Sequence, residues 1–380
     1  MIYLDNAATS YHKPKAVAEA VYRALMGTGN SGRGAHEASL EAGRITLRTR
    51  EAIASMFHAG DSSRVVFTSN ATESLNIVIQ GLLRPGDHCI TTAMEHNSVL
   101  RPLYLMEGRR TALTVLPLDD KGRLDPNGIE AAVKKNTRAV ILTHASNVTG
   151  NVNDLSAISD ICRKHHLLFI LDASQTAGLL PIDMGQLGIS ALCCSGHKGL
   201  MGPQGTGVLL LGADCNPTPL KAGGTGVDSF SHGMPSGLPE ALEAGTGNIH
   251  GMAGLLAACE YIEKYGLSNI HRRAMELTDI FVEGMKLLPG VRLYGDYDAA
   301  LRVPVISLNI GEIDSGEVAD ELFQRFQIAT RAGAHCAPLL HEAMGTREQG
   351  MVRFSFSHWN TPEEVQEAIA AMRTLEEEYR

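Results

Sequence analysis

A carboxylate and a lysine follow two neighbouring apolar segments. Asp172 closes an apolar run at 168–171, and Lys198 comes shortly after the next such run. If both runs are parallel strands of one sheet, the two side chains emerge at its carboxyl edge, where open α/β folds bind ligands. A lysine for a Schiff base and a carboxylate for a pyridine nitrogen together suit pyridoxal 5'-phosphate. Taken singly, Asp172 could be a helix cap and Lys198 an ordinary loop residue.

A second group of residues suits a phosphate. The run at 65–68 has strand length, and a helical pattern begins near Thr72. Free backbone amides at such a helix start, at Ala71 and Thr72, could hold a phosphate dianion together with the Thr72 hydroxyl. N-capping by Asn70 or Thr72 explains the same residues without a ligand.

His96 follows the apolar run at 89–92 and should lie beside the same sheet edge. Its planar imidazole could stack on a pyridine ring. Spacing alone does not separate this role from that of a histidine in a surface loop.

The seven cysteines lack the spacing of metal ligands, so we expect no metal site. Several of them lie in apolar runs and should be small buried hydrophobic residues. Cys336 differs, because Arg331, Gly333 and His335 give it a polar and flexible setting. We expect an exposed thiol with thiolate character, and a structural cysteine is the alternative.

Short apolar runs alternate with helical patterns from about residue 64 to residue 212. This alternation predicts a mostly parallel, seven-stranded sheet covered by helices on both faces. A Gly- and Pro-rich stretch at 216–239 reads as loops, and a long helical region at 252–288 follows it. Near the end, Thr361 should cap an amphipathic helix, with a first-turn proline and a capping-box glutamate after it.

These patterns predict an α/β protein with two domains. The large ligand-binding domain would span residues 14–245, and a smaller α+β domain would span residues 246–380. The N-terminal segment 1–13 should pack near the active site.

Composition excludes several classes of partner. The chain has 380 residues, of which 44% are hydrophobic, and a formal net charge of -9. Such a charge leaves no basic surplus for a nucleic-acid backbone. No stretch approaches the roughly 18 apolar residues that span a bilayer, and no charged leader precedes an apolar segment at the start. We therefore expect a cytoplasmic protein with no nucleic-acid or membrane partner.

Four motifs together resemble the class V aminotransferase family and, within it, the SufS-like group of cysteine desulfurases and selenocysteine lyases. Two further stretches, near the start and at Arg353, extend the similarity almost end to end. The four motifs, in chain order, are Thr68 to Glu73, Asp172 to Gln175, Ser195 to Lys198, and Arg331 to Cys336. The resemblance implies the fold-type I architecture of pyridoxal-phosphate enzymes and a homodimer with active sites at the subunit interface.

The resemblance assigns roles around the cofactor ring. Lys198 would form the Schiff base, and Asp172 would pair with the pyridine nitrogen. Gln175 would donate to the ring hydroxyl, and His96 would stack on the ring. Lys198, Asp172 and His96 are accordingly expected to be catalytic.

Other matching positions would bind the cofactor phosphate. These are Ala71 and Thr72 at the helix start, with Ser195 and His197 beside the lysine. Thr246 matches a threonine that reaches the phosphate of the neighbouring subunit. The family usually has proline where this chain has Gly247, so this region suggests a distinct branch.

The remaining assignments concern the substrate. Asn147 matches an asparagine near cofactor and substrate, and Arg353 matches the arginine that binds the substrate carboxylate, a task that suits a planar guanidinium. Cys336 would attack the sulfur of bound L-cysteine, become a persulfide, and leave alanine behind. The short spacing from Cys336 to Arg353 resembles the SufS-like group, which implies a restrained loop and a protein or thiol that accepts the sulfur.

Three alternatives share these residues. A selenocysteine lyase would use every one of them and release selenide. A class V aminotransferase or epimerase would use Lys198 and Asp172 but has no need of Cys336. A protein that binds the cofactor without catalysis would need a blocked site, and the presence of Lys198 argues against it.

Overall fold

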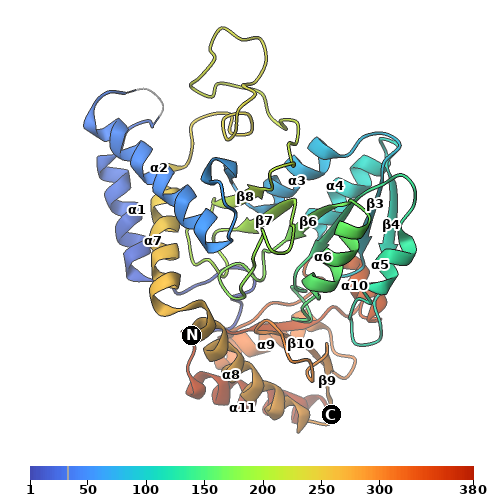
Figure 1. The fold of residues 1–380 in the computed structure, drawn as a ribbon. Helices are drawn as coiled ribbons and strands as arrows, with labels where there is room; N and C mark the ends of the chain where they lie inside the picture. Colours follow the sequence, from blue (N-terminus) through green and yellow to red (C-terminus); the bar gives the residue numbers. More distant parts are fainter. Residues whose placement is uncertain (32–33) are drawn as a thin grey trace.

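A seven-stranded sheet with helices on both faces forms the larger part of the molecule, and a smaller sheet with its own helices lies below it (Figure 1). The structure is a computed structural model that describes residues 1–31 and 34–380. Both chain termini lie beside the smaller part. Among the described residues, no helix is long and apolar enough to cross a lipid bilayer.

The large sheet has the strand order β2-β8-β7-β6-β5-β3-β4. Only β8 runs opposite to its neighbours, so the predicted mostly parallel, seven-stranded sheet is confirmed. The strands in its middle are almost entirely buried, as expected for a sheet covered on both faces, whereas the edge strand β4 is mostly half-buried. They are β2 (Val65–Thr68), β3 (His88–Thr92), β4 (Ala112–Leu116), β5 (Thr137–Thr143), β6 (Leu168–Asp172), β7 (Ala191–Ser195) and β8 (Gly207–Leu211).

Four crossover helices connect these strands. The helical patterns of the sequence predict these helices at 72–83, 97–106, 127–135 and 154–165. Three of the four match closely, but the helix predicted at 127–135 ends early, at Ala132. The backbone amide of Lys134 donates to the Thr137 hydroxyl, which turns the chain into β5. The helices are α3 (Ala71–Leu82), α4 (Asn97–Glu107), α5 (Asn127–Ala132) and α6 (Leu155–Lys164).

Three further helices pack together at one side of the sheet: α1 (Lys15–Gly27), α2 (Glu37–Met56) and α7 (Ile249–Tyr265). The helical region predicted at 252–288 is two helices, because Gly266 takes a φ of 91° and ends α7. Glycine adopts this left-handed conformation at little cost. The second helix is α8 (Leu267–Lys286).

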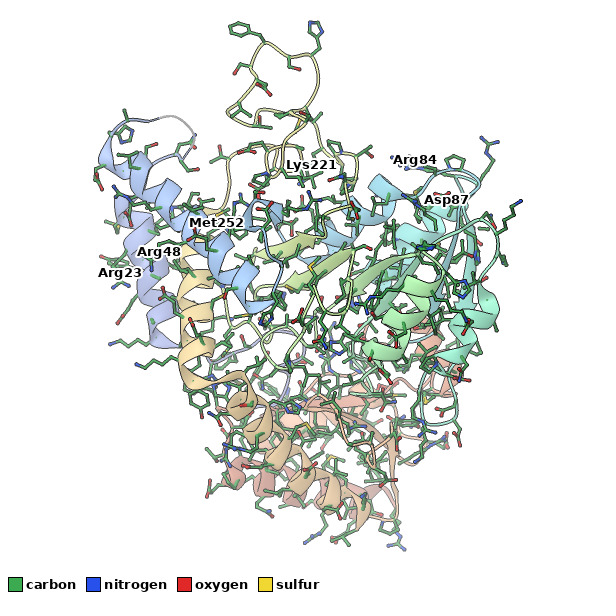
Figure 2. The ribbon with its side chains drawn as sticks, in the orientation of Figure 1. Arg23, Arg48, Arg84, Asp87, Lys221 and Met252 are labelled. Carbon is green, nitrogen blue, oxygen red and sulfur yellow. The ribbon has the colours of Figure 1, made fainter. Side chains whose placement is uncertain are left out.

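Between β8 and α7 the described chain forms neither helix nor strand, as the Gly- and Pro-rich sequence predicts. This loop extends away from the sheet at the top of Figure 1. Near its start, Lys221 forms an ion pair with Glu73 of α3 (Figure 2).

The smaller sheet has the order β12-β10-β9 and is antiparallel. Its strands are β9 (Val291–Tyr294), β10 (Val305–Ile310) and β12 (Val352–Ser355). Helices α8, α9 (Ser315–Phe326) and α11 (Pro362–Tyr379) enclose an apolar core against it, and the short helix α10 (Pro338–Ala343) follows Cys336. The predicted capping box at the start of α11 is confirmed, with Thr361 and Glu364 bonded reciprocally.

The N-terminal segment lies against the smaller part. Its strand β1 (Ile2–Tyr3) pairs in parallel with β11 (Ile328–Ala329). Leu4 is fully buried in the same core as the small sheet. The division into domains at residues 245 and 246 stays a prediction.

Candidate active site

Asp172 is the last residue of β6, and Lys198 lies shortly after the adjacent parallel strand β7. Asp172 is 3% exposed, and its Oδ1 accepts hydrogen bonds from the Ser174 amide at 2.9 Å and the Ser174 hydroxyl at 2.5 Å. Within the described part of the chain, no group donates to the second oxygen, Oδ2. One carboxylate oxygen is therefore available to a ligand.

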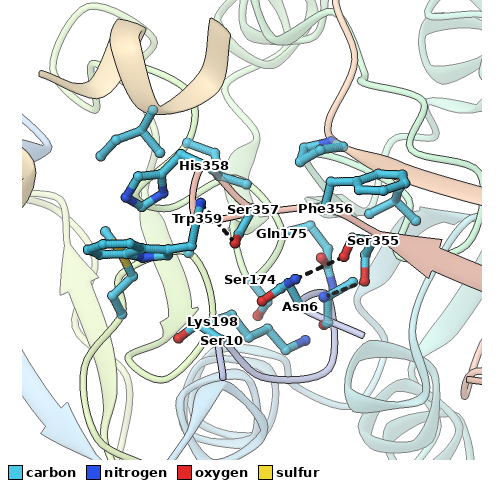
Figure 3. Close-up of a pocket in the computed structure, with 17 residues that line it drawn as sticks. Asn6, Ser10, Ser174, Gln175, Lys198, Ser355, Phe356, Ser357, His358 and Trp359 are labelled. Atoms are coloured by element: carbon cyan, nitrogen blue, oxygen red, sulfur yellow. Dashed lines mark hydrogen bonds between the residues drawn. The ribbon is translucent and has the colours of Figure 1, made fainter. Parts of the chain in front are cut away.

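Lys198 lies in a tight turn after β7 and lines a cavity between the N-terminal segment and the small sheet (Figure 3). Burial lowers the pKa of its amine from 10.5 to about 8, and the nearby charges of Arg353 and Arg331 act in the same direction. The carboxylates of Asp172 and Asp5 oppose this effect. A substantial fraction of the amine is therefore neutral near physiological pH, as a nucleophile or base requires.

His96 caps α4, and its Nδ1 accepts a hydrogen bond from the Ser98 amide. The Ser98 hydroxyl lies 2.8 Å from the same nitrogen and 2.8 Å from the Thr72 hydroxyl. Burial lowers the pKa of His96 to about 4, with the charge of Lys198 as the next cause. The imidazole is therefore neutral at pH 7, a state in which it can stack on an aromatic ring.

The start of α3 carries unused amide donors. The Asn70 side chain caps the helix by accepting from the Glu73 amide, so the predicted cap is present. The amides of Ala71 and Thr72 have no acceptor among the described residues. Capping and anion binding are therefore compatible at this helix, since they use different amides.

Ser195 and His197 flank the lysine turn. Ser195 is buried at the end of β7, opposite Gly207 of β8. His197 Nδ1 lies 3.0 Å from the Thr9 hydroxyl, and burial lowers the pKa of this histidine to about 4. No hydrogen bond within the described chain links either side chain to Thr72.

Arg353 and Asn147 join the small sheet to the large one. Arg353 is 2% exposed, and its Nη1 donates to the carbonyl oxygen of Asn147 at 3.0 Å. The Asn147 side-chain amide in turn donates to the carbonyl oxygen of His335 at 2.8 Å. A chain of two hydrogen bonds thus runs from Arg353 to the residue before Cys336.

Cys336 is the exposed cysteine, and the other six are buried, as predicted. His335 and Cys336 both adopt the left-handed conformation, with φ values of 47° and 57°. The Cys336 carbonyl accepts a hydrogen bond from the Asn97 amide at 2.7 Å. This bond places the thiol-bearing segment beside His96.

Two residues predicted to bind the cofactor, Gln175 and Thr246, are placed differently from the others. The Gln175 side-chain amide donates to the carbonyl oxygen of Ala7 at 3.2 Å, so the N-terminal segment already uses one of its donors. Thr246 is exposed and does not line the cavity beside Lys198. It lines a second cavity of about 990 Å³, between α2, β2 and the loop before α7.

Sequence reasoning assigned no role to Asp5, Ser98 and Glu95. Asp5 pairs with Arg353, Ser98 links Thr72 to His96, and the buried Glu95 accepts a hydrogen bond from the Thr143 amide of β5. Ser98 could have been found from its place two residues after a helix-capping histidine. The corresponding signal for Glu95 is a glutamate shortly after an apolar strand, which ends at Thr92. Asp5 has no local signal, because its partner Arg353 lies far away in the sequence.

A family model described as aminotransferase class-V matches residues 2–368. A probable cysteine desulfurase of Methanothermobacter thermautotrophicus is 34% identical over 372 residues, which cover 96% of this chain and 92% of the relative. A cysteine desulfurase of Klebsiella pneumoniae is 32% identical over 391 residues, which cover 99% of this chain and 93% of the relative.

Two solved structures have a similar fold. The apo structure of a cysteine desulfurase from Thermococcus onnurineus superposes with a TM-score of 0.94 at 33% identity, covering 99% of this chain and 95% of that one. The cysteine desulfurase CsdA from Escherichia coli, in an S-sulfonic acid form, gives a TM-score of 0.89 at 30% identity, with coverage of 98% and 94%.

Proposed function

The chain belongs to the aminotransferase class-V family, and on that premise we propose that it is a pyridoxal-phosphate-dependent cysteine desulfurase. The reaction converts L-cysteine to L-alanine and transfers the sulfur to an enzyme cysteine as a persulfide. The observation that carries this function is the link from Arg353 through Asn147 to the segment of the exposed Cys336.

The residues present fit the cofactor. Asp172 Oδ2 is free to accept the N–H of a pyridine ring, and neutral His96 can stack on that ring. The amides of Ala71 and Thr72 would hold the phosphate, with the hydroxyl of Thr72 beside them. We assign Ser195 and His197 to the same phosphate, and Gln175 to the ring hydroxyl. When bound, the cofactor supplies an aldehyde for a lysine amine and a ring that withdraws electrons from the substrate's α-carbon.

Lys198 is proposed to carry the cofactor and to move the proton at the substrate's α-carbon. Its lowered pKa favours both tasks, because the neutral amine is the nucleophile and the base. Asp172 would keep the ring nitrogen protonated, since a buried carboxylate favours a positive partner. Arg353 would bind the substrate carboxylate, and Asn147 would help to orient it.

Cys336 is proposed to take the sulfur. Its thiolate attacks the substrate's sulfur, so a sulfur–sulfur bond forms as the bond from sulfur to the β-carbon breaks. The electron pair of the broken bond stays on the β-carbon, where a proton completes the methyl group of alanine. No external oxidant is needed, because the substrate carbon is reduced as the sulfur is oxidised to the persulfide level.

A product assay with defined substrates tests this function. Purified protein loaded with pyridoxal phosphate is incubated with L-cysteine, and alanine and sulfide are measured with and without a thiol reductant. We expect alanine in both cases, with sulfide released mainly when the reductant regenerates Cys336. Transamination of amino-acid and keto-acid pairs without alanine from cysteine would instead favour the aminotransferase alternative.

A homodimer and a sulfur acceptor complete the proposal. Thr246 is exposed on the wall of the second cavity, so in a dimer it would be available to the partner's phosphate site. Exposed apolar side chains on α1 and α2, such as Leu25, Met26 and Leu47, are suited to a protein interface. The acceptor would be a protein or a small thiol that reaches the exposed Cys336.

Selenocysteine is proposed as a second substrate of the same residues, because selenium leaves more readily than sulfur. Comparing alanine formation from the two amino acids measures the preference. We also propose a cytoplasmic location, which accords with seven cysteines that form no disulfide.

A further inference from the structure

Arg353 forms an ion pair with Asp5 of the same chain. The guanidinium Nη2 donates to Asp5 Oδ1 at 2.7 Å, while Nη1 donates to the carbonyl of Asn147. The third nitrogen, Nε, is buried and has no acceptor among the described residues. A buried donor of a charged group is costly without a partner, so this atom marks where a ligand oxygen is expected.

Asp5 is itself fixed before any ligand binds. Its carbonyl oxygen accepts hydrogen bonds from the Tyr3 hydroxyl at 3.1 Å, the Ala8 amide at 3.1 Å and the Thr9 amide at 3.4 Å. The backbone of Asp5 also bridges to Ser355 of β12, two residues beyond Arg353. Neighbouring Asn6 donates to the Ser355 carbonyl at 3.0 Å (Figure 3). The carboxylate is therefore presented to Arg353 by a rigid loop.

We propose that Asp5 is a positioning residue for the substrate carboxylate. By holding Nη2, Asp5 fixes the rotation of the guanidinium so that the Nε edge faces the ligand. This inference deepens the proposed function and rests on it, because the ligand is taken to be an α-amino acid. Asp5 acts on the substrate carboxylate through Arg353 and touches no reacting atom, so it is not a catalytic residue.

The ion pair also changes what Arg353 recognises. The Asp5 carboxylate offsets the guanidinium charge. The affinity of a ligand therefore depends less on its overall negative charge and more on well-aligned hydrogen bonds to the guanidinium. The pair therefore favours a carboxylate in one orientation over anions in general. The affinity for an amine that lacks a carboxylate should depend little on Asp5.

The test compares L-alanine, the product, with cysteamine, which has the amine and thiol of cysteine but no carboxylate. Binding of each is measured in the cofactor-loaded protein by the change in cofactor absorbance and, independently, by calorimetry. Asp5→Ala should weaken L-alanine binding by roughly tenfold or more, as expected for a lost hydrogen bond to a charged group. Cysteamine binding should stay within about threefold of wild type.

Conservative variants separate positioning from folding. Asp5→Asn keeps an oxygen acceptor for Nη2 and should restore L-alanine binding to within about threefold of wild type. Asp214→Ala, an exposed acidic residue remote from the site, is the matched control and should change neither ligand. If Asp5→Ala fails to fold, Tyr3→Phe removes one bond that fixes Asp5. This variant should weaken L-alanine binding by about fivefold and leave cysteamine binding within about threefold of wild type.

Two results would overturn the inference. One is wild-type affinity for L-alanine in Asp5→Ala, or in Tyr3→Phe if that variant stands in for it. The other is an equal loss of both ligands in Asp5→Ala and Asp5→Asn, which would indicate a general structural role. L-alanine binding needs no turnover, so a protein that follows the expected pattern but forms no alanine from cysteine would contradict the proposed reaction alone.

Discussion

The two halves of the site are built in different ways. Asp172 is the last residue of β6, and Lys198 and His96 lie shortly after β7 and β3. The backbone of one sheet therefore sets the positions of all three. Arg353 lies where the N-terminal segment meets the small sheet, and Cys336 lies in the segment before α10. The contacts of both segments join residues far apart in sequence. We call Asp172, Lys198 and His96 the strand-end half of the site, and we call Arg353 and Cys336 the joint half.

Because of this difference, substitutions in the two halves should affect different steps of the reaction. Changes in the strand-end half leave the sheet intact and should act on proton transfer and cofactor attachment. The joint half depends on side-chain hydrogen bonds between separate segments, such as the bond from Asn147 to His335. Changes there should act on substrate binding and sulfur transfer while the cofactor stays bound.

Lys198→Ala should have the largest effect, because it removes the group proposed to attach the cofactor and to move the proton. Alanine formation should fall by at least about 10⁴-fold, as in the loss of other central catalytic groups. Borohydride reduction and peptide mapping of the wild type should find the pyridoxyl group on Lys198. Lys13 is the matched control, since burial lowers its pKa to about 8 as well. Attachment at Lys13 would contradict the assignment.

Cys336→Ala tests the joint half. The cofactor spectrum and its shift on adding cysteine should survive, while alanine formation should fall by roughly 10²-fold or more. The control is Cys162→Ala, which removes a buried thiol of the core and should lower the unfolding free energy by about 1 kcal/mol with activity retained. Wild-type turnover in Cys336→Ala would return that cysteine to a structural role.

Glu95→Gln probes the electrostatics of the strand-end half. Burial raises the pKa of Glu95 from 4.5 to about 8. The folded state therefore holds a proton that the unfolded state releases between these pH values. The stability from Glu95 is fully present below pH 4.5 and is lost as pH rises through about 8. Glutamine has no such titration, so the variant should gain stability relative to wild type from pH 5 to pH 8.

Denaturant titrations at several pH values measure this difference. A constant gap between Glu95→Gln and wild type across the window would mean that Glu95 is ionised in the folded protein. The same series at one pH also reports whether glutamine preserves the hydrogen bond from the Thr143 amide.

Thr361→Ala should have the smallest effect on activity, because Thr361 belongs to neither half of the site. It breaks the capping box of α11 and should lower the unfolding free energy by about 1 kcal/mol. Alanine formation at a temperature well below the unfolding transition should be unchanged, and Thr361→Ser should restore stability. A loss of activity without a loss of stability would contradict this expectation and would couple the start of α11 to the site.

The positions of the residues in the strand-end half could be predicted because their signals are local, but the spacing alone does not give the role of His96. An apolar run that ends in Asp172 and a second run that leads to Lys198 are sufficient, once both strands are parallel and adjacent. The capping box at Thr361 is equally local. Helix ends depended on finer details, such as the Thr137 hydroxyl that ends α5 early and the Gly266 conformation that divides α7 from α8.

In the joint half, the exposure of Cys336 has a local signal in its polar neighbours, whereas the role of Arg353 could be predicted only by resemblance. Nothing near Asp5 in sequence indicates that it pairs with Arg353, because the pairing requires β1, β11 and β12 to meet. The strands β1 and β11 are too short for a hydrophobic period. The left-handed conformations of His335 and Cys336 are likewise imposed by contacts with distant segments, including the bond from Asn97 to Cys336.

The most direct test of the account is to locate the transferred sulfur. The cofactor-loaded protein is given less than one equivalent of L-cysteine, its thiols and persulfides are trapped with an alkylating reagent, and the peptides are analysed by mass spectrometry. We expect one additional sulfur atom on the peptide that contains Cys336, in an amount equal to the alanine formed. Alanine formed without protein-bound sulfur, or with the sulfur on a buried cysteine, would contradict the account.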